Sequence, residues 1–194
     1  AYLEDHPLER DALTELLEES ATYAMAHPLA PAGLVVGVGL RAADAVSQPS
    51  ADKELLVAGT GAVFAYVPGY DGSVGPDDPA YVAADLDAMV ALAAARPVVL
   101  VTGYPSAGEA GSSEASQQAF YGALFEALEA RREAFHAVSA LRLYDVPEGV
   151  CAAELADLGY DPDDPYGATW CSLGLRRADD DVKPAWSAVL VGLS

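Results

Sequence analysis

Four apolar segments, each separated from the next by a stretch with helical periodicity, constrain the fold of this chain more than any other feature. They cover residues 34–40, 62–66, 98–101 and 140–144 and are rich in branched and aromatic side chains. Most of these runs are continuous rather than alternating, which is typical of strands buried on both faces of a sheet. No hairpin signal joins any two of them. The pattern therefore predicts an α/β fold in which parallel strands alternate with helices.

Helices are expected wherever apolar residues recur at every third or fourth position. The first covers residues 8–26, and a short one follows over 51–57. The next opens at Asp77, Asp78 and Pro79, because an acidic cap followed by proline is a common helix start. Its inner face is expected to carry Val82, Leu86, Met89, Val90 and Ala93.

Three more helices are expected in the second half of the chain. A long one opens at Ser112, Ser113 and Glu114, a short one lies near 152–158, and the last begins at Pro184. The apolar face of the long helix is expected to comprise Ala119, Phe120, Ala123, Leu124, Leu128 and Phe135.

The length of the chain limits how these elements can be arranged. A complete (β/α)8 barrel usually needs about 250 residues, whereas this chain has 194 residues and four predicted strands. One domain over 1–194 is the simplest expectation. No glycine-rich nucleotide-binding loop follows any of the strands, so the remaining choices are an open parallel sheet or part of a barrel.

The charge of the chain excludes two classes of partner. Thirty acidic residues against ten basic ones give a net charge of -20, which disfavours nucleic acids and anionic lipid surfaces. The longest uncharged run, residues 20–40, is interrupted by Pro31 and Gly33 and is not expected to span a membrane.

Neither a metal nor a cofactor is expected from the residues. Cys151 and Cys171 match no zinc spacing, and His6, His27 and His136 are scattered. The two cysteines are compatible with one disulfide or with two free thiols.

Residues 96–120 read RPVVLVTGYPSAGEAGSSEASQQAF. This segment resembles the seventh strand and following loop of (β/α)8 glycoside hydrolases related to clan A. The resemblance extends to a strand-six segment at 64–68, a strand-eight segment at 141–145 and a closing segment at 173–186. It implies the C-terminal half of a TIM (β/α)8 barrel, strands five to eight.

The same resemblance implies that the catalytic carboxylates are missing. Retaining glycosidases use two carboxylates about 5 to 5.5 Å apart, one as acid and one as nucleophile. The family's nucleophile position aligns with Val101, and the neighbouring Thr102 is not a carboxylate either. The acid/base glutamate of the family would lie just before Ala1. No catalytic residue is therefore assigned, and impaired or absent hydrolysis is expected.

Substrate-binding candidates are the side chains at the C-terminal ends of the strands, where barrel enzymes place their chemistry. Arg41 and Asp44 follow the first strand. From the family pattern and the aromatic content, Tyr66, Tyr104, Asp145 and Trp170 are the expected sugar-binding residues. Packing in the core is an equally good role for Tyr66, and a turn or capping role for Asp145.

The leading hypothesis is a carbohydrate-active, glycoside-hydrolase-like domain with an oligo- or polysaccharide as its partner. The alternatives are a non-catalytic module that binds glycans or proteins, and a hydrolase that uses Glu109, Asp145 or a second chain. Because half a barrel leaves two sheet edges uncovered, self-association or a missing N-terminal half is also expected. The resemblance to secreted hydrolases implies a secreted or periplasmic location and a disulfide between Cys151 and Cys171.

Overall fold

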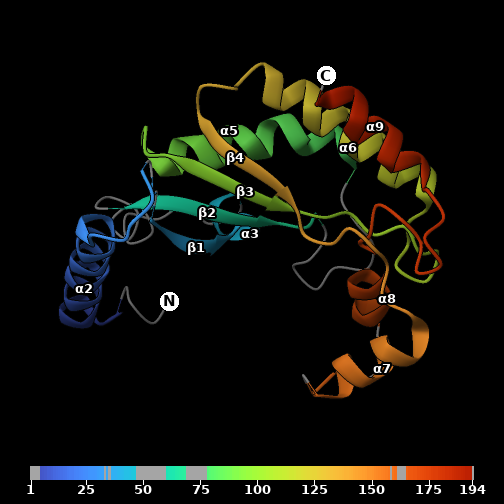
Figure 1. Ribbon diagram of the computed structural model, residues 1–194, viewed down its shortest axis with the longest axis horizontal. Coiled ribbons are helices and arrows are strands. Elements are labelled where there is room, and N and C mark those ends of the chain that lie inside the picture. Colours follow the sequence, from blue (N-terminus) through green and yellow to red (C-terminus); the bar gives the residue numbers. More distant parts are fainter. Residues whose placement is uncertain are drawn as a thin grey trace. The chain divides into compact units, whose positions relative to one another are not determined.

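The computed structural model describes residues 5–32, 34, 36–46, 60–68, 78–157, 159–160 and 165–193. Four strands form one sheet in the order β1-β2-β3-β4, and helices alternate with them along the chain (Figure 1). The strands are parallel, which confirms the predicted α/β fold. The elements are α2 (Pro7–Ala26), β1 (Gly37–Arg41), α3 (Ala42–Val46), β2 (Gly61–Tyr66), η1 (Pro79–Tyr81), α5 (Val82–Ala93), β3 (Val98–Thr102), α6 (Glu114–Glu129), β4 (Phe135–Ala140), α7 (Glu148–Asp157), α8 (Pro165–Cys171) and α9 (Pro184–Gly192).

Two compact units share these strands. The first comprises Ala1–Ala65, Asp85–Leu100 and Arg132–Val138, and the second Tyr66–Ala84, Val101–Arg131 and Ser139–Ser194. That the whole chain acts as one domain remains a prediction. No helix within the described ranges is both long enough and apolar enough to cross a bilayer.

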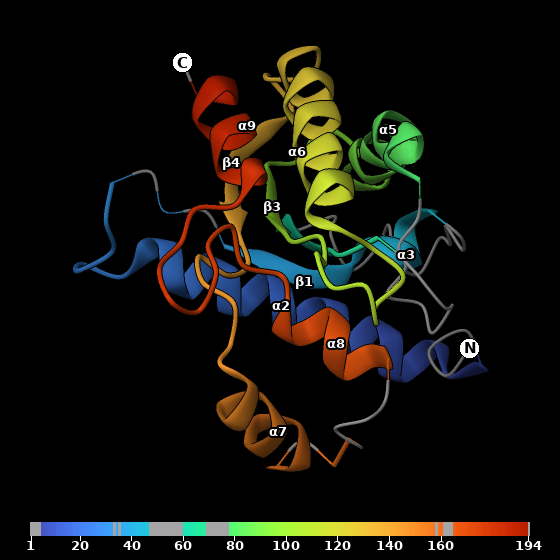
Figure 2. The ribbon, with the colours of Figure 1, turned by 90° about the vertical axis from the view of Figure 1, so that its right-hand side faces the viewer.

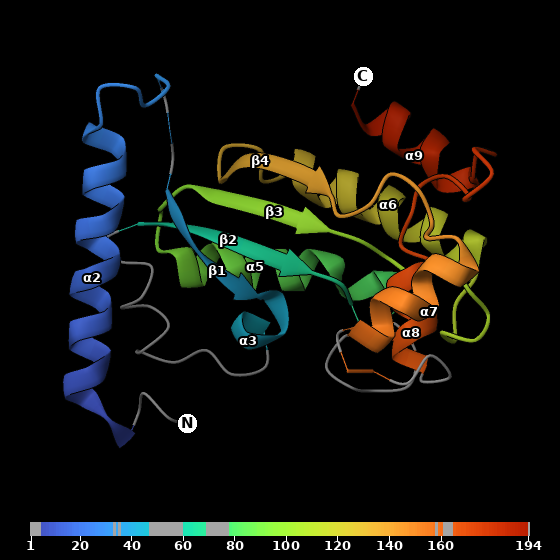
Figure 3. The same ribbon diagram turned by 60° about the horizontal axis from the view of Figure 1, so that its bottom comes forward.

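In the first unit, β1 and β2 run side by side in the same direction (Figure 3). Gly37 pairs with Gly61 at the start of this ladder, and an added Cβ on Gly37 would overlap the Gly61 carbonyl. A glycine is therefore required where the two strands approach. Ala62 N in turn donates to Pro97 O, at 3.0 Å.

The core of the first unit forms where α5 and the strands bury their apolar side chains. Of the inner-face residues expected for α5, Leu86, Met89 and Ala93 are buried here, and Val90 is half-buried. The strands contribute Ala62, Phe64, Val98 and Leu100. By contrast α2, which matches its predicted range closely, buries only Ala21.

In the second unit, the start of α6 follows the predicted capping chemistry. The Ser113 side chain accepts a hydrogen bond from Ser116 N at 3.1 Å. Helix α9 lies alongside α6 (Figure 2). Gly192 of α9 meets the Phe125 ring of α6 so closely that a Cβ would overlap it. The absence of a side chain at this glycine thus allows the two helices to pack.

Several predicted boundaries were wrong. The fourth strand is β4, not 140–144, because the backbone after Ala140 pairs with Arg176 instead. Arg176 N donates to Leu143 O at 2.9 Å, and Asp145 N donates to Arg176 O at 2.8 Å. Phe135, assigned to the face of the long helix, lies in β4, since α6 ends at Glu129.

Two further boundaries were also placed wrongly, and one helix was not foreseen. β1 begins at Gly37 rather than at residue 34, and α7 begins at Glu148 rather than at 152. Helix α8 was not predicted. The short helix expected over 51–57 lies outside the described residues.

Candidate functional site

A buried lysine joins the segments that follow β3 and β4. Lys183 is 1% exposed, and its Nζ donates to Asp145 Oδ1 at 2.6 Å. It also donates to Ser106 Oγ at 2.7 Å and to Gly174 O at 2.9 Å. Three oxygen acceptors match the three N–H donors of an ammonium group. Lys183 therefore acts as a polar anchor and not as a free base.

Burial sets the acid–base behaviour of this pair. Burial raises the pKa of Asp145, although the Lys183 hydrogen bond and charge and the Gly174 N–H act in the opposite direction. Burial likewise lowers the pKa of Lys183, opposed by its bond to Asp145. In both residues the loss of hydration is the largest effect.

Gln117 of α6 holds the same region from the other side. The side chain is fully buried, and its Nε2 donates to Tyr104 O at 2.7 Å and to Gly174 O at 3.0 Å. Gly174 also donates its backbone N–H to Asp145 Oδ1 at 3.0 Å. A Cβ on Gly174 would overlap the backbone of residues 144 and 145. The network thus fixes Asp145 in the segment between β4 and α7.

A pocket of about 720 Å³ opens beside Asp145. Four carboxylates line it, those of Glu109, Glu114, Asp145 and Glu148. Arg177, the cation in the lining, is held by Glu114 through two hydrogen bonds of 2.9 Å. The rest of the wall is largely apolar: Ala107, Val146, Pro147, Ala152, Leu155, Ala168 and the two cysteines. The lining of this pocket combines hydrogen-bond acceptors with apolar side chains, and this combination suits a ligand rich in hydroxyl groups.

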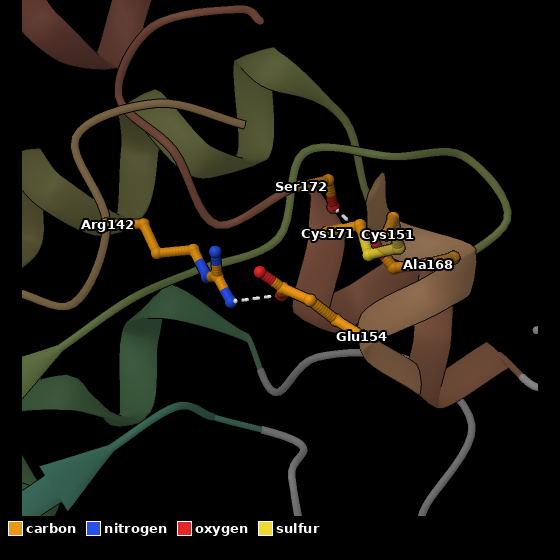
Figure 4. The surroundings of a disulfide bond; sticks show 6 residues. All are labelled: Arg142, Cys151, Glu154, Ala168, Cys171 and Ser172. Carbon is orange, nitrogen blue, oxygen red and sulfur yellow. Dashed lines mark hydrogen bonds and ion pairs between the residues drawn. A yellow bond between two sulfur atoms is a disulfide. The ribbon is translucent and has the colours of Figure 1, made fainter. Parts of the chain in front are cut away.

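The disulfide between Cys151 and Cys171 joins α7 to α8 at this wall (Figure 4). Arg142 donates to Glu154 Oε2 at 3.0 Å, which ties α7 to the segment after β4. The Arg142 guanidinium also lies 4.7 Å from the centre of the Trp170 ring, a cation–π contact. Trp170, expected to stack on a sugar, is half-buried and has one face against this arginine.

The two tyrosines expected at the sugar site lie in the core of the second unit. Tyr66 is 4% exposed and Tyr104 is 2% exposed. Their ring centres lie 5.8 Å and 4.7 Å from that of Phe120, respectively. The structure gives both rings a packing role, and a sugar contact by either stays a prediction.

Val101 is the second-last residue of β3. Val98, Leu100 and Thr102 are buried, whereas Val99 and Val101 are half-buried, so Val101 points to the opposite, less covered face. Thr102 donates its hydroxyl to Tyr66 O at 2.9 Å. Glu109 is an exposed loop residue that lines the pocket.

The remaining strand-end candidates and metal ligands add little to this site. Arg41 is the exposed last residue of β1, and the side chain of Asp44 lies outside the described ones. Within the described ranges, no three His, Cys, Asp or Glu side chains are grouped so as to hold a metal ion.

The polar network around Lys183 was missed from the sequence. The one available signal was that Lys183, one of two lysines in the chain, stands between an acidic turn and Pro184. Buried lysines are rare, so the sequence by itself gives no reason to expect one at this position.

No family model matches this sequence, and no curated protein matches it either. Among solved structures, a thermostable mutant of a xylanase from Cellvibrio japonicus is 15% identical, with a TM-score of 0.56 over 93% of this chain and 54% of that one. A family 17 β-1,3-glucanosyltransferase from Rhizomucor miehei is 17% identical, with a TM-score of 0.55 over 91% and 56%. A Clostridium thermocellum endo-1,4-β-D-xylanase complexed with xylohexaose is 17% identical, with a TM-score of 0.53 over 90% and 32%.

The chain spans about half of the first two structures and a third of the last. Its described residues therefore have the fold of part of a TIM (β/α)8 barrel. Solved structures that share this fold include two xylanases and a family 17 glucanosyltransferase, in line with the resemblance seen in the sequence. Identities of this size show the fold alone.

Proposed function

We propose that this chain is a glycoside-hydrolase-like, carbohydrate-active domain that does not hydrolyse glycosides by its own residues. The proposal rests on one observation: a valine, Val101, stands near the C-terminal end of β3, half-buried on the less covered face of the strand. In glycoside hydrolase barrels this is where chemistry is placed. A valine can neither attack an anomeric carbon nor stabilise an oxocarbenium ion.

The neighbouring residues supply no obvious replacement. Thr102 is buried and its hydroxyl is engaged by Tyr66 O. Asp145 is bonded to Lys183, which directs its Oδ1 toward the protein interior rather than toward a substrate. The family's acid/base glutamate aligns outside these 194 residues, so both members of the catalytic pair would have to come from elsewhere.

The partner proposed is an oligo- or polysaccharide. The pocket beside Asp145 supports it, since Glu109 and Glu148 present carboxylates that can accept hydrogen bonds from sugar hydroxyls. Trp170 supplies an aromatic ring in the same unit, and Tyr66 and Tyr104 would act chiefly by supporting the loop. Laminaritriose, bound by an active-site mutant of the Rhizomucor miehei β-1,3-glucanosyltransferase, and xylohexaose, bound by the Clostridium thermocellum xylanase, are ligands of those proteins.

A non-catalytic module that binds proteins is the alternative. The wider proposal is one domain, secreted or periplasmic, that pairs with an N-terminal barrel half or with a second copy of itself. The disulfide at the pocket wall fits an oxidising compartment.

Hydrolysis of activated aryl glycosides tests the proposal. The hydrolysis rate of the unmodified chain is expected to equal the background rate. The Val101→Glu variant alone is expected to show the same background rate, because the acid/base carboxylate is also absent. Val99→Glu, on the same face of β3, is the matched control. Activity is expected only when Val101→Glu is combined with an N-terminal half that carries the missing glutamate.

Two results would contradict the proposal. Enzymatic turnover that survives Glu109→Gln and Asp145→Asn would show that Val101 does not occupy the nucleophile position. Turnover abolished by either substitution would instead show a hydrolase with relocated carboxylates.

A further inference from the structure

A second pocket, of about 680 Å³, lies in the first unit where β3 and β4 begin. Val90, Pro97, Val98 and Phe135 give it an apolar wall. Arg96, Arg132 and His136 also line it, together with Glu133. None of these residues takes part in the candidate site described above.

The charge of this pocket is opposite to that of the chain. Acidic residues outnumber lysines and arginines by thirty to ten overall, yet here two arginines face one glutamate. Arg132 Nε lies 3.7 Å from Glu133 Oε1, and because the two side chains are 70% and 95% exposed, solvent screens this ion pair. Arg96 and His136 take part in none of the ion pairs found between described residues.

The backbone fixes Arg96 at the mouth of the pocket. Ala94 and Ala95 have φ values of 47° and 65°, in the left-handed region that alanine seldom adopts. This turn brings Arg96 N onto Ala93 O, at 2.9 Å. Pro97, next in the chain, is tied to the sheet through its carbonyl. The base of the Arg96 side chain is thereby held between two fixed points.

We propose that this pocket binds an organic anion, a carboxylate or phosphate group carried on a compact apolar body. Guanidinium groups present paired N–H donors that match both kinds of anionic oxygen. The wall formed by Val90, Val98 and Phe135 would remove the apolar body from water. An anion without an apolar part would keep its contacts with the arginines but would bury no apolar surface against this wall.

The proposal is tested by titrating the 194-residue chain with four probes and monitoring its amide resonances by NMR. Phenyl phosphate and benzoate represent the two anionic groups, benzamide is the neutral isostere of benzoate, and inorganic phosphate lacks the apolar body. The anionic aromatic probes are expected to shift pocket resonances, and their relative affinity shows which anionic group is preferred. Benzamide and inorganic phosphate are expected to bind several-fold more weakly.

Variants assign the binding to the arginines. Arg96→Gln and Arg132→Gln are each expected to weaken the preferred probe by about three- to fivefold, as for partly exposed ion pairs. Arg10→Gln, on α2 and outside the pocket, is the matched control and should change nothing. Circular dichroism checks that the variants fold.

Three results would overturn the proposal. Benzamide binding as tightly as benzoate would show a merely apolar hollow. An unchanged Kd in the double arginine variant would place the anion elsewhere. The absence of saturable binding by about 10 mM would show no site of this kind.

Discussion

Lys183 is almost completely buried, and three oxygen atoms accept hydrogen bonds from its Nζ. Asp145, Ser106 and Gly174 supply them from segments far apart in the sequence. A buried ion pair is worth little overall because both ions lose hydration, but removing one partner strands the other. The pair therefore fixes local geometry more than it adds to stability.

A double-mutant cycle tests this view of the pair. Lys183→Met and Asp145→Asn are each expected to lower the free energy of unfolding by about 3 kcal/mol, since each leaves the other residue without its partner. The combined variant should lose clearly less than the sum. Arg132→Met, at an exposed ion pair, should stay within about 0.5 kcal/mol. Urea denaturation measures all four, and simple additivity would argue against a coupled pair.

The raised pKa of Asp145 predicts how the stability of the chain depends on pH in the acid range. Because burial raises its pKa above the ordinary 3.8, the folded chain takes up this proton at a higher pH than the unfolded chain does. The contribution of Asp145 to stability is then largest below pH 3.8 and falls as the pH rises through the raised pKa.

Denaturation of the unmodified chain and of Asp145→Asn, between about pH 3 and pH 6, measures that contribution. The advantage of the unmodified chain should shrink as the pH rises. An advantage that grows with pH would mean that the Lys183 charge outweighs burial.

At the residue scale the family resemblance singled out Asp145, which lines the pocket in the second unit, whereas the alignment of Val101 with the nucleophile position stays a prediction. The sequence did not identify Lys183 or Gln117, because their importance arises from contacts with residues 9 to 77 positions away. Spacing along a helix or strand carries no information about such contacts.

Among the elements, those with strong local signals were predicted well. The N-cap at Ser113 and Pro184 at the start of α9 mark helix ends by chemistry confined to one turn. Helix α8 was missed because residues 165–171 include glycine, threonine and aromatic residues, which are weak helix formers. β4 was misplaced because the pairing of residues 143–145 with Arg176 is a tertiary effect.

The disulfide between Cys151 and Cys171 is the covalent link between α7 and α8. Replacing Cys151 and Cys171 by alanine is expected to lower the free energy of unfolding by about 3 kcal/mol, as for a closed loop with 20 residues of separation. Thermal unfolding with and without reductant measures the loss. Reductant should destabilise the unmodified chain and leave the double alanine variant unchanged. Two titratable thiols in protein made in an oxidising compartment would refute the pairing.

For the molecule as a whole, the sheet has two edge strands within the described residues, β1 and β4. Five of the six residues of β4 are exposed, although parallel sheets are normally covered on both faces. We expect concentration-dependent self-association, or a monomer only when an N-terminal barrel half is supplied. Sedimentation velocity over a range of concentrations measures this. A chain that stays monomeric alone at high concentration would contradict the expectation.

Fold class was the part of the whole that could be predicted, because parallel strands require buried apolar runs separated by helices. The ligand could not be predicted, since neither a strand pattern nor a barrel fold specifies which sugar fits a pocket. The pocket beside Asp145 is built from loops and short helices whose positions follow from the disulfide and the Lys183 network.

The central claim is that this glycoside hydrolase fold binds a glycan without cleaving it. Calorimetric titration of the chain with laminaritriose and with xylohexaose, followed by mass spectrometry of the recovered sugar, tests both halves together. The account predicts saturable binding of at least one oligosaccharide, weakened by Glu109→Gln and Glu148→Gln, with the sugar recovered intact. Recovery of shortened sugars, or no binding of either oligosaccharide, would contradict it.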